Sequence, residues 1–230
     1  MNRWLKVLAG IVIFLVLLTV FWTYHTNNMY ENSLQSDYDY RVSVDTRSTL
    51  HNVTLYLPLP VFENKSPLGE ELVSRGSGDL PPEWKLSIMD TEYGPMLNIE
   101  AQEIQPPGDY FSFYFSPGHE LNTRFPVGNE SVLLPKNNLR ESDEGPLVSP
   151  PSHINPLYYD YESQVYASYD TRPDFEVQIS VSLRGSNEWW IYGWTGNSYS
   201  DKVTARLIGP QDGWSPAEGL LVTGDGVYRD

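Results

Sequence analysis

The stretch FEVQISVSL, residues 175–183, decides the fold class. Its odd-numbered positions are apolar and its even-numbered positions are polar; the apolar set is Phe175, Val177, Ile179, Val181 and Leu183. A period of two is typical of a strand that buries one face and exposes the other. The stretch therefore predicts a half-buried strand in an antiparallel sheet.

The same period recurs through most of the chain. Alternating or strand-like segments cover residues 38–44, 53–59, 84–88, 97–101, 111–115, 158–169, 203–207 and 220–223. Glycine and proline clusters separate them, and we expect further turns at 185–187 and 195–197. Many short strands with closely spaced turns favour a mainly β fold, an antiparallel β-sandwich-like domain over residues 37–230.

Two segments interrupt the strands and predict long loops, near 62–83 and 117–156. The first is rich in proline and glycine, with one helical turn expected at 69–74. The second has four prolines after position 145 and one short strand expected at 131–134. Loops of this length often carry function, although a variable surface excursion is the simpler interpretation.

A short motif is repeated within the chain. The motif Asp-Thr-Arg occurs at 45–47 and again at 170–172, each time between two alternating segments. One interpretation is a duplicated hairpin, with residues 38–58 equivalent to 163–182. The other is the independent reuse of a favourable turn, in which the aspartate bonds its own backbone.

A different pattern marks the N-terminal region. Residues 7–22 read VLAGIVIFLVLLTVFW and contain no charge. About 20 helical residues cross the hydrocarbon core of a bilayer, and residues 4–24 have that length. Trp4 lies at one end and Trp22 and Tyr24 at the other, as aromatic residues do at the two membrane interfaces. We expect residues 4–24 to span the lipid bilayer.

The flanks of this segment predict its orientation. Arg3 and Lys6 lie on the short side, which places the N-terminus in the cytoplasm and the rest of the chain outside the cell. Residues 1–25 then form a cytoplasmic tip and a transmembrane signal anchor, and 26–36 a polar stalk. A cleaved signal peptide is the alternative, but the end of the apolar run lacks small residues in an A-x-A-like pattern. Either interpretation exports the domain.

Composition excludes several classes of protein. The chain has 30 Asp and Glu against 15 Lys and Arg, a net charge of −15. This balance argues against a nucleic-acid partner, whose phosphates need a basic surface. Cysteine is absent, so an exported domain must be stable without disulfides.

Catalytic motifs are hard to find in this sequence. It has no cysteine nucleophile and no G-x-S-x-G elbow, and its four histidines have no helical zinc spacing. His119 beside Glu120 is the one acid-base candidate, and a solvated histidine is the simpler interpretation. Asp37 with Asp39, and Asp160 with Glu162, offer weak calcium candidates. We expect no catalytic residues, no resident metal and no cofactor.

Aromatic residues give the best binding candidate. Trp189, Trp190, Tyr192 and Trp194 lie within six positions. If one face of this segment is exposed, its rings could stack on sugars. The alternative is that the rings fill the core.

Three N-x-S/T sequons, at Asn52, Asn64 and Asn129, predict glycosylation if the exporting cell carries out that modification. Together these features predict a non-enzymatic, membrane-anchored cell-surface domain that serves the envelope or binds an envelope protein. A carbohydrate-binding or adhesion module is the alternative.

Overall fold

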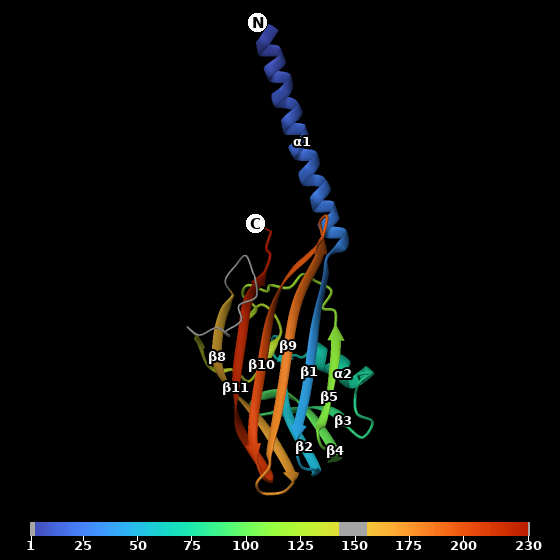
Figure 1. The fold of residues 1–230 in the computed structure, drawn as a ribbon, viewed down its shortest axis with the longest axis vertical. Coiled ribbons are helices and arrows are strands. Elements are labelled where there is room, and N and C mark those ends of the chain that lie inside the picture. The colour runs from blue at the N-terminus through green and yellow to red at the C-terminus, as the bar shows by residue number, and fades with distance from the viewer. Residues whose placement is uncertain (1–2, 143–155, 230) are drawn as a thin grey trace.

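The chain folds as one long helix followed by an antiparallel β domain (Figure 1). The computed structural model describes residues 3–142 and 156–229. The helices are α1 (Arg3–Ser33) and α2 (Pro67–Arg75). The strands are β1 (Gln35–Thr46), β2 (Leu50–Val61), β3 (Lys85–Thr91), β4 (Gly94–Ile104), β5 (Gly108–Phe115), β6 (Val132–Leu134), β7 (Asn137–Glu141), β8 (Leu157–Asp170), β9 (Glu176–Trp190), β10 (Trp194–Ile208) and β11 (Gln211–Gly226). The predicted mainly β, antiparallel fold with an N-terminal apolar helix is confirmed.

One curled sheet forms the domain. Its strand order is β3-β4-β2-β8-β11-β10-β9-β1-β5, with β6 paired to β2 and β7 to β8. In Figure 1, β1, β9 and β10 lie in front of β2, β3 and β4, and β11 joins the two layers because it pairs with both β10 and β8. The inner faces enclose a single apolar core that draws on both layers. In β9, for example, Val177, Ile179, Val181 and Leu183 are all buried, as their alternation predicts.

The strand β11 changes layers at a defined point. Its second half pairs with β10 from Thr204↔Glu218 onward, whereas its first half pairs only with β8. Pro216 lies just before that point. Proline has no backbone N–H to donate to a neighbouring strand. Its position therefore suits the part of β11 that does not pair with β10. The strand is much longer than the predicted segment 220–223.

The repeated Asp-Thr-Arg motif lies at two similar corners, where the chain passes from one layer to the other, rather than in two hairpins. The strands β1 and β2 lie in opposite layers, and so do β8 and β9, while β1 pairs with β9 and β2 with β8. The two corners are therefore stacked, and the Thr171 hydroxyl donates to the Thr49 carbonyl at 3.0 Å. The interpretation of 38–58 and 163–182 as equivalent hairpins is therefore wrong, because in the described structure β1 does not pair with β2 and β8 does not pair with β9.

The turns predicted at 185–187 and 195–197 are also wrong. The strands β9 and β10 run straight through both segments and turn instead at 191–193, where Tyr192 has φ 53°. The glycines in these segments mark close approaches. A Cβ on Gly185 would lie 2.4 Å from the Tyr199 ring, and one on Gly196 would lie 2.2 Å from the Asn187 carbonyl oxygen.

The helix α2 lies against β2, β3 and β5, and its Leu68 and Leu72 are buried. Ser66 caps this helix by accepting from the Gly69 amide, and Pro67 occupies its first turn. The sequence predicts one helical turn at 69–74, whereas the helix begins at Pro67 and ends at Arg75. In the second long loop, the strand predicted at 131–134 is present as β6. Residues 143–155 lie outside the described residues.

Candidate functional site at the junction of helix and domain

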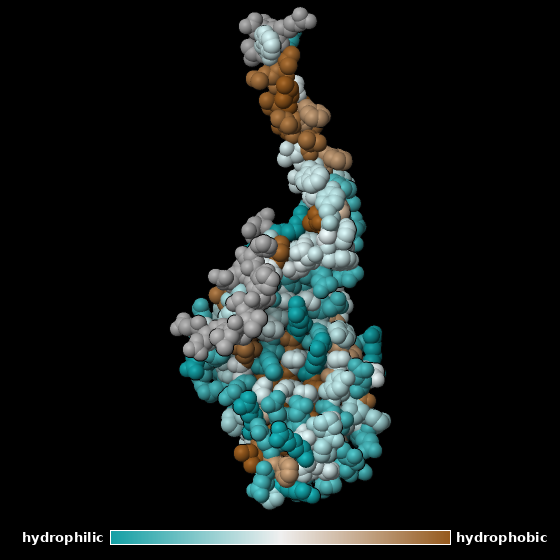
Figure 2. Space-filling view, in the orientation of Figure 1, coloured by the Kyte–Doolittle hydropathy of each residue, from teal (hydrophilic) through white to brown (hydrophobic). Residues whose placement is uncertain are grey.

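The helix α1 has no break between its apolar and polar parts. Its segment Lys6–Ser33 is long and apolar enough to cross a membrane. Side chains of the apolar run are 51–64% exposed from Leu8 to Phe21, since no other part of the described chain covers them. Figure 2 shows this hydrophobic part of the helix projecting away from the mostly hydrophilic domain. An uncovered apolar surface of this size marks an interaction with lipid or protein.

The helix α1 is longer than a bilayer core is thick. The 31 residues of α1 rise about 46 Å, against about 30 Å for a hydrocarbon core. A bilayer core would take up about 20 of these residues, which would leave the segment from about Trp22 to Ser33 outside it. Residues 26–36, predicted as a polar stalk, are in fact helical through Ser33 and enter β1 at Gln35.

The junction between helix and domain is short and tightly bonded. Only Leu34 separates α1 from β1. The Ser33 hydroxyl accepts from the Trp190 amide at 2.8 Å and lies 3.3 Å from the Trp190 carbonyl. The Tyr30 ring packs edge-on against Trp189 with centroids 5.3 Å apart. Because these contacts join α1 directly to β9, the helix and the sheet form a continuous unit at this end.

The tail and the second long loop add further contacts to α1. The Tyr30 hydroxyl donates to the Glu120 carboxylate at 2.5 Å. The Arg229 guanidinium donates to the Asn27 side chain at 2.8 Å and lies 4.5 Å from the centre of the Tyr30 ring. Three separate parts of the β domain thus hold the polar end of the helix.

The predicted aromatic cluster divides between core and surface. Trp189 is buried at 2% exposure, whereas Trp190, Tyr192 and Trp194 are 40%, 57% and 61% exposed. These last three residues surround the β9–β10 turn and are called the aromatic tip below. Figure 1 shows this turn beside α1. The cluster thus contributes rings both to the core and to the surface.

The rings of the aromatic tip do not form a flat platform. Trp190 and Trp194 are cross-strand partners whose rings meet edge to face, 69° apart in plane. The Tyr192 ring is instead stacked on Trp22 of α1, with centroids 5.5 Å and planes 16° apart. This geometry suits burial among mixed polar and apolar groups better than stacking on one sugar face.

A buried amide network lies beneath the aromatic tip. Asn187 accepts from the Ser36 hydroxyl and the Leu121 amide, and donates to the Leu121 carbonyl and to Asn197. Asn197 also accepts from the Thr123 hydroxyl. The network ties the loop after β5 to the ends of β1, β9 and β10. Sequence reasoning treated both asparagines as turn residues and missed their role.

The acid-base candidate His119 does not pair with Glu120. Its Nε2 lies 3.2 Å from Glu130, whose buried carboxylate also accepts from the Tyr38 hydroxyl and the Asn122 amide. Glu120 is engaged by Tyr30 instead. The carboxylate beside His119 therefore holds the loop after β5 to β1.

A lysine–aspartate ion pair is buried in the core. Asp201 of β10 accepts from Lys136 Nζ at 2.8 and 3.0 Å, from the Tyr161 hydroxyl at 2.5 Å and from the Leu133 amide. The side chains of Lys136 and Asp201 are 4% and 0% exposed. Burial lowers the pKa of Lys136, while burial and Asp201 together raise the pKa of Tyr161 above its ordinary value. The group anchors β6 and the following segment onto β10 and β8.

The sequon asparagines Asn52, Asn64 and Asn129 are all exposed. Asn52 and Asn64 have left-handed backbones, with φ 54° and 61°. Asn52 lies at an irregularity in the β2–β8 pairing and donates to Asp170 at 3.3 Å. Exposure meets the steric requirement for glycosylation, which stays a prediction at these positions.

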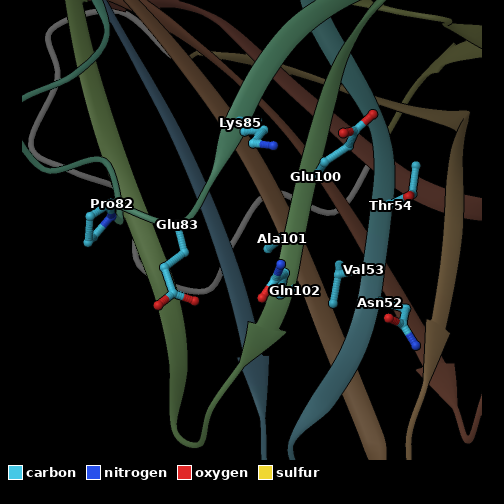
Figure 3. A pocket seen from close by; sticks show the side chains of 9 residues that line it. All are labelled: Asn52, Val53, Thr54, Pro82, Glu83, Lys85, Glu100, Ala101 and Gln102. Atoms are coloured by element: carbon cyan, nitrogen blue, oxygen red, sulfur yellow. The ribbon is translucent and has the colours of Figure 1, made fainter.

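A further hollow on the surface is an open depression of about 500 Å³ on the outer face of β2 and β4 (Figure 3). Its lining is Asn52, Val53, Thr54, Pro82, Glu83, Lys85, Glu100, Ala101 and Gln102. Figure 3 shows these side chains spread along three adjacent segments rather than converging on one point. In the described ranges, no group of three or more histidine and acidic side chains could hold a metal ion. The two calcium candidates, Asp37 with Asp39 and Asp160 with Glu162, therefore have no third histidine or acidic ligand beside them in the described residues.

A second aromatic cluster, which the sequence analysis did not identify, lies on the outer face of the sheet. Tyr56 stacks on Tyr166 with centroids 4.7 Å apart, and Trp214 contacts both rings and Tyr93 at 4.8–6.1 Å. All four side chains are half-buried. They come from β2, β8, β11 and the β3–β4 turn, so only the strand order brings them together.

Comparison with known proteins adds no relative. No family model, no curated protein and no solved structure matches this chain.

Proposed function

We propose that the chain is a single-pass, membrane-anchored cell-surface protein whose β domain is a non-enzymatic envelope or interaction module. The observation that carries the proposal is the unbroken helix α1. Its exposed apolar part has the length of a bilayer core, and its polar part is bonded to the domain by Ser33, Tyr30 and Asn27.

The proposed orientation has the N-terminus in the cytoplasm and the β domain outside. Arg3 and Lys6 flank the apolar run on its short side, in line with the positive-inside rule. The net charge of −15 also suits a domain held off an anionic membrane surface by a helix rather than lying flat upon it.

The bonding of two buried carboxylates supports the non-enzymatic role. The Glu130 and Asp201 carboxylates are buried and bonded to loop and strand groups, which is typical of structural polar groups. The depression of Figure 3 is open and lacks convergent side chains, whereas binding sites for small molecules are usually concave and enclosed.

Cysteine accessibility in intact cells tests the anchor and the orientation together. The chain has no cysteine, and a Cβ on Gly78 would meet nothing within 4 Å. A Gly78→Cys variant should react with a membrane-impermeant maleimide added outside the cells, and the protein should require detergent for extraction. Protection of this cysteine until the cells are lysed would refute the orientation, and extraction without detergent would refute the anchor.

A carbohydrate-binding or adhesion role is the second candidate. It is favoured by the outer-face cluster of Tyr56, Tyr93, Tyr166 and Trp214, whose half-exposed rings could stack on sugar faces. Binding to a glycan array by the wild-type protein, lost in a Trp214→Ala variant, would support it. Equal signals from both proteins, or none from either, would end it.

A further inference from the structure

We infer that the aromatic tip is a second membrane contact, which sits in the headgroup layer of the same bilayer that α1 crosses. The inference rests on the proposed anchor but goes beyond it. It assigns a lipid surface as the partner of Trp190, Tyr192 and Trp194, and it predicts a fixed tilt of the domain rather than free rotation about a tether.

Position along α1 gives the first argument. Trp22 is the last residue of the uncharged apolar run, so it marks the boundary between hydrocarbon and headgroups. Tyr192 is stacked on Trp22, and its ring lies 6.2 Å from His25, just past that boundary. The turn of β9 and β10 therefore reaches the same depth as the end of the membrane-spanning segment.

Side-chain chemistry gives the second argument. Tryptophan and tyrosine have an apolar ring and a polar group, and they are enriched where hydrocarbon meets water. The three residues of the aromatic tip stay 40–61% exposed in the folded chain. A bilayer interface would bury their rings and leave the indole and phenol polar groups in contact with water and headgroups.

The charged residues near the β9–β10 turn agree with a shallow position of the aromatic tip in the membrane. The nearest acidic residue on β9 is the exposed Glu188, two positions before Trp190. Two strand residues span about 7 Å. Glu188 therefore lies about 7 Å further from the turn than Trp190, on the side of the aromatic tip where the proposal places water. On the neighbouring elements Glu31, Asp225 and Arg229 also flank the junction on its aqueous side.

Three single-cysteine variants test the inference, because a Cβ at each glycine meets nothing within 4 Å and none of the three has a positive φ. Gly10→Cys reports on the apolar part of α1, Gly193→Cys on the aromatic tip and Gly78→Cys on the distant loop before β3. Neighbouring Ser77 bonds to Ser112, which pairs with Arg41 of β1. Arg41 lies roughly 20 Å along the strand from Gln35, so Gly78→Cys is a matched aqueous control.

Each variant of the full chain is spin-labelled and reconstituted into phosphatidylcholine vesicles. The measured quantity is the ratio of accessibility to oxygen, which enters lipid, over accessibility to a water-soluble nickel chelate. We expect the ratio to be highest at Gly10→Cys, intermediate at Gly193→Cys and lowest at Gly78→Cys. Adding Tyr192→Ser and Trp194→Ser to the Gly193→Cys chain should lower its ratio towards that of Gly78→Cys.

The outcomes separate the two proposals. Equal ratios at Gly193→Cys and Gly78→Cys, with a high ratio at Gly10→Cys, would overturn the tip contact and leave the anchor intact. A low ratio at Gly10→Cys would overturn the anchor itself. Spin–spin broadening at Gly193→Cys that disappears when labelled chain is diluted with unlabelled chain would show that a second copy covers the aromatic tip, and would also overturn the lipid contact.

Discussion

The ring of Tyr192, at the turn between two strands, is stacked on the ring of Trp22, at the end of the apolar helix, with centroids 5.5 Å apart. These residues are separated by most of the chain, yet their contact places the β9–β10 turn beside the end of the apolar run of α1. This aromatic contact adds to the covalent link at Leu34 and to the hydrogen bonds of Ser33, Tyr30 and Asn27 that join the helix to the domain.

Removing the buried carboxylate of Asp201 should destabilise the domain strongly. Asp201→Ala leaves the ammonium of Lys136 and the hydroxyl of Tyr161 buried without their acceptor. Breaking a buried ion pair in this way costs about 3–5 kcal/mol. Chemical denaturation of the full chain in detergent measures the effect. Lys202→Ala, at the next and exposed position of β10, is the control and should change stability by less than about 0.5 kcal/mol.

A single methyl group at Gly219 should also destabilise the fold. A Cβ there would lie 2.2 Å from the ring of Tyr161, its cross-strand partner. The ring has to move, although it covers Lys136 and donates to Asp201. We expect Gly219→Ala to cost about 1–3 kcal/mol. Gly78→Ala, in open space, should be neutral or stabilising by thermal melting, and equal effects of the two substitutions would contradict the packing argument.

Alkaline pH should weaken the domain in a defined window. Burial, reinforced by the nearby Glu130 carboxylate, raises the pKa of Tyr38 from 10.0 to about 12. The folded state therefore keeps a proton that the unfolded state loses, so the stabilisation is fully present below pH 10 and decreases as the pH rises from 10 to 12. Melting temperatures measured across this range should fall, and the fall should be shallower in Tyr38→Phe. An identical slope in both proteins would refute this assignment.

Glycosylation should depend on the host. In a cell that modifies exported N-x-S/T sites, we expect glycans on the exposed Asn52, Asn64 and Asn129. Intact mass before and after enzymatic deglycosylation gives the occupancy. Asn→Asp is the preferred substitution for assigning each site, because aspartate also tolerates the left-handed backbone at 52 and 64. A mass unchanged by deglycosylation would remove the prediction.

The strands were predictable because their alternation is local. The period of two in 175–183 places Val177 and Val181 in the core without any knowledge of their partners. The start of α2 was also predictable, because Ser66 followed by Pro67 is typical of a helix N-terminus. The predicted helical turn began later, at residue 69. Strand order was not predictable, since pairing β1 with β9 and β2 with β8 depends on contacts between segments more than 100 residues apart.

The errors have a common physical cause. Gly185 and Gly196 resemble turn residues in the sequence, but each allows a close approach by Tyr199 or by the Asn187 backbone. Asp201 and Lys136 resemble surface charges, and only the curled sheet buries them together. In the same way, the aromatic tip could be recognised as exposed aromatic surface, but its contact with Trp22 appears only in three dimensions.

Membrane fractionation of the full chain tests the central claim most directly. After washing with alkaline carbonate, the protein should remain in the membrane pellet with residues 1–24 present by peptide mass mapping, and it should enter solution only with detergent. Recovery of the chain in the soluble fraction without detergent, with those residues still intact, would contradict the anchor and every conclusion drawn about the aromatic tip.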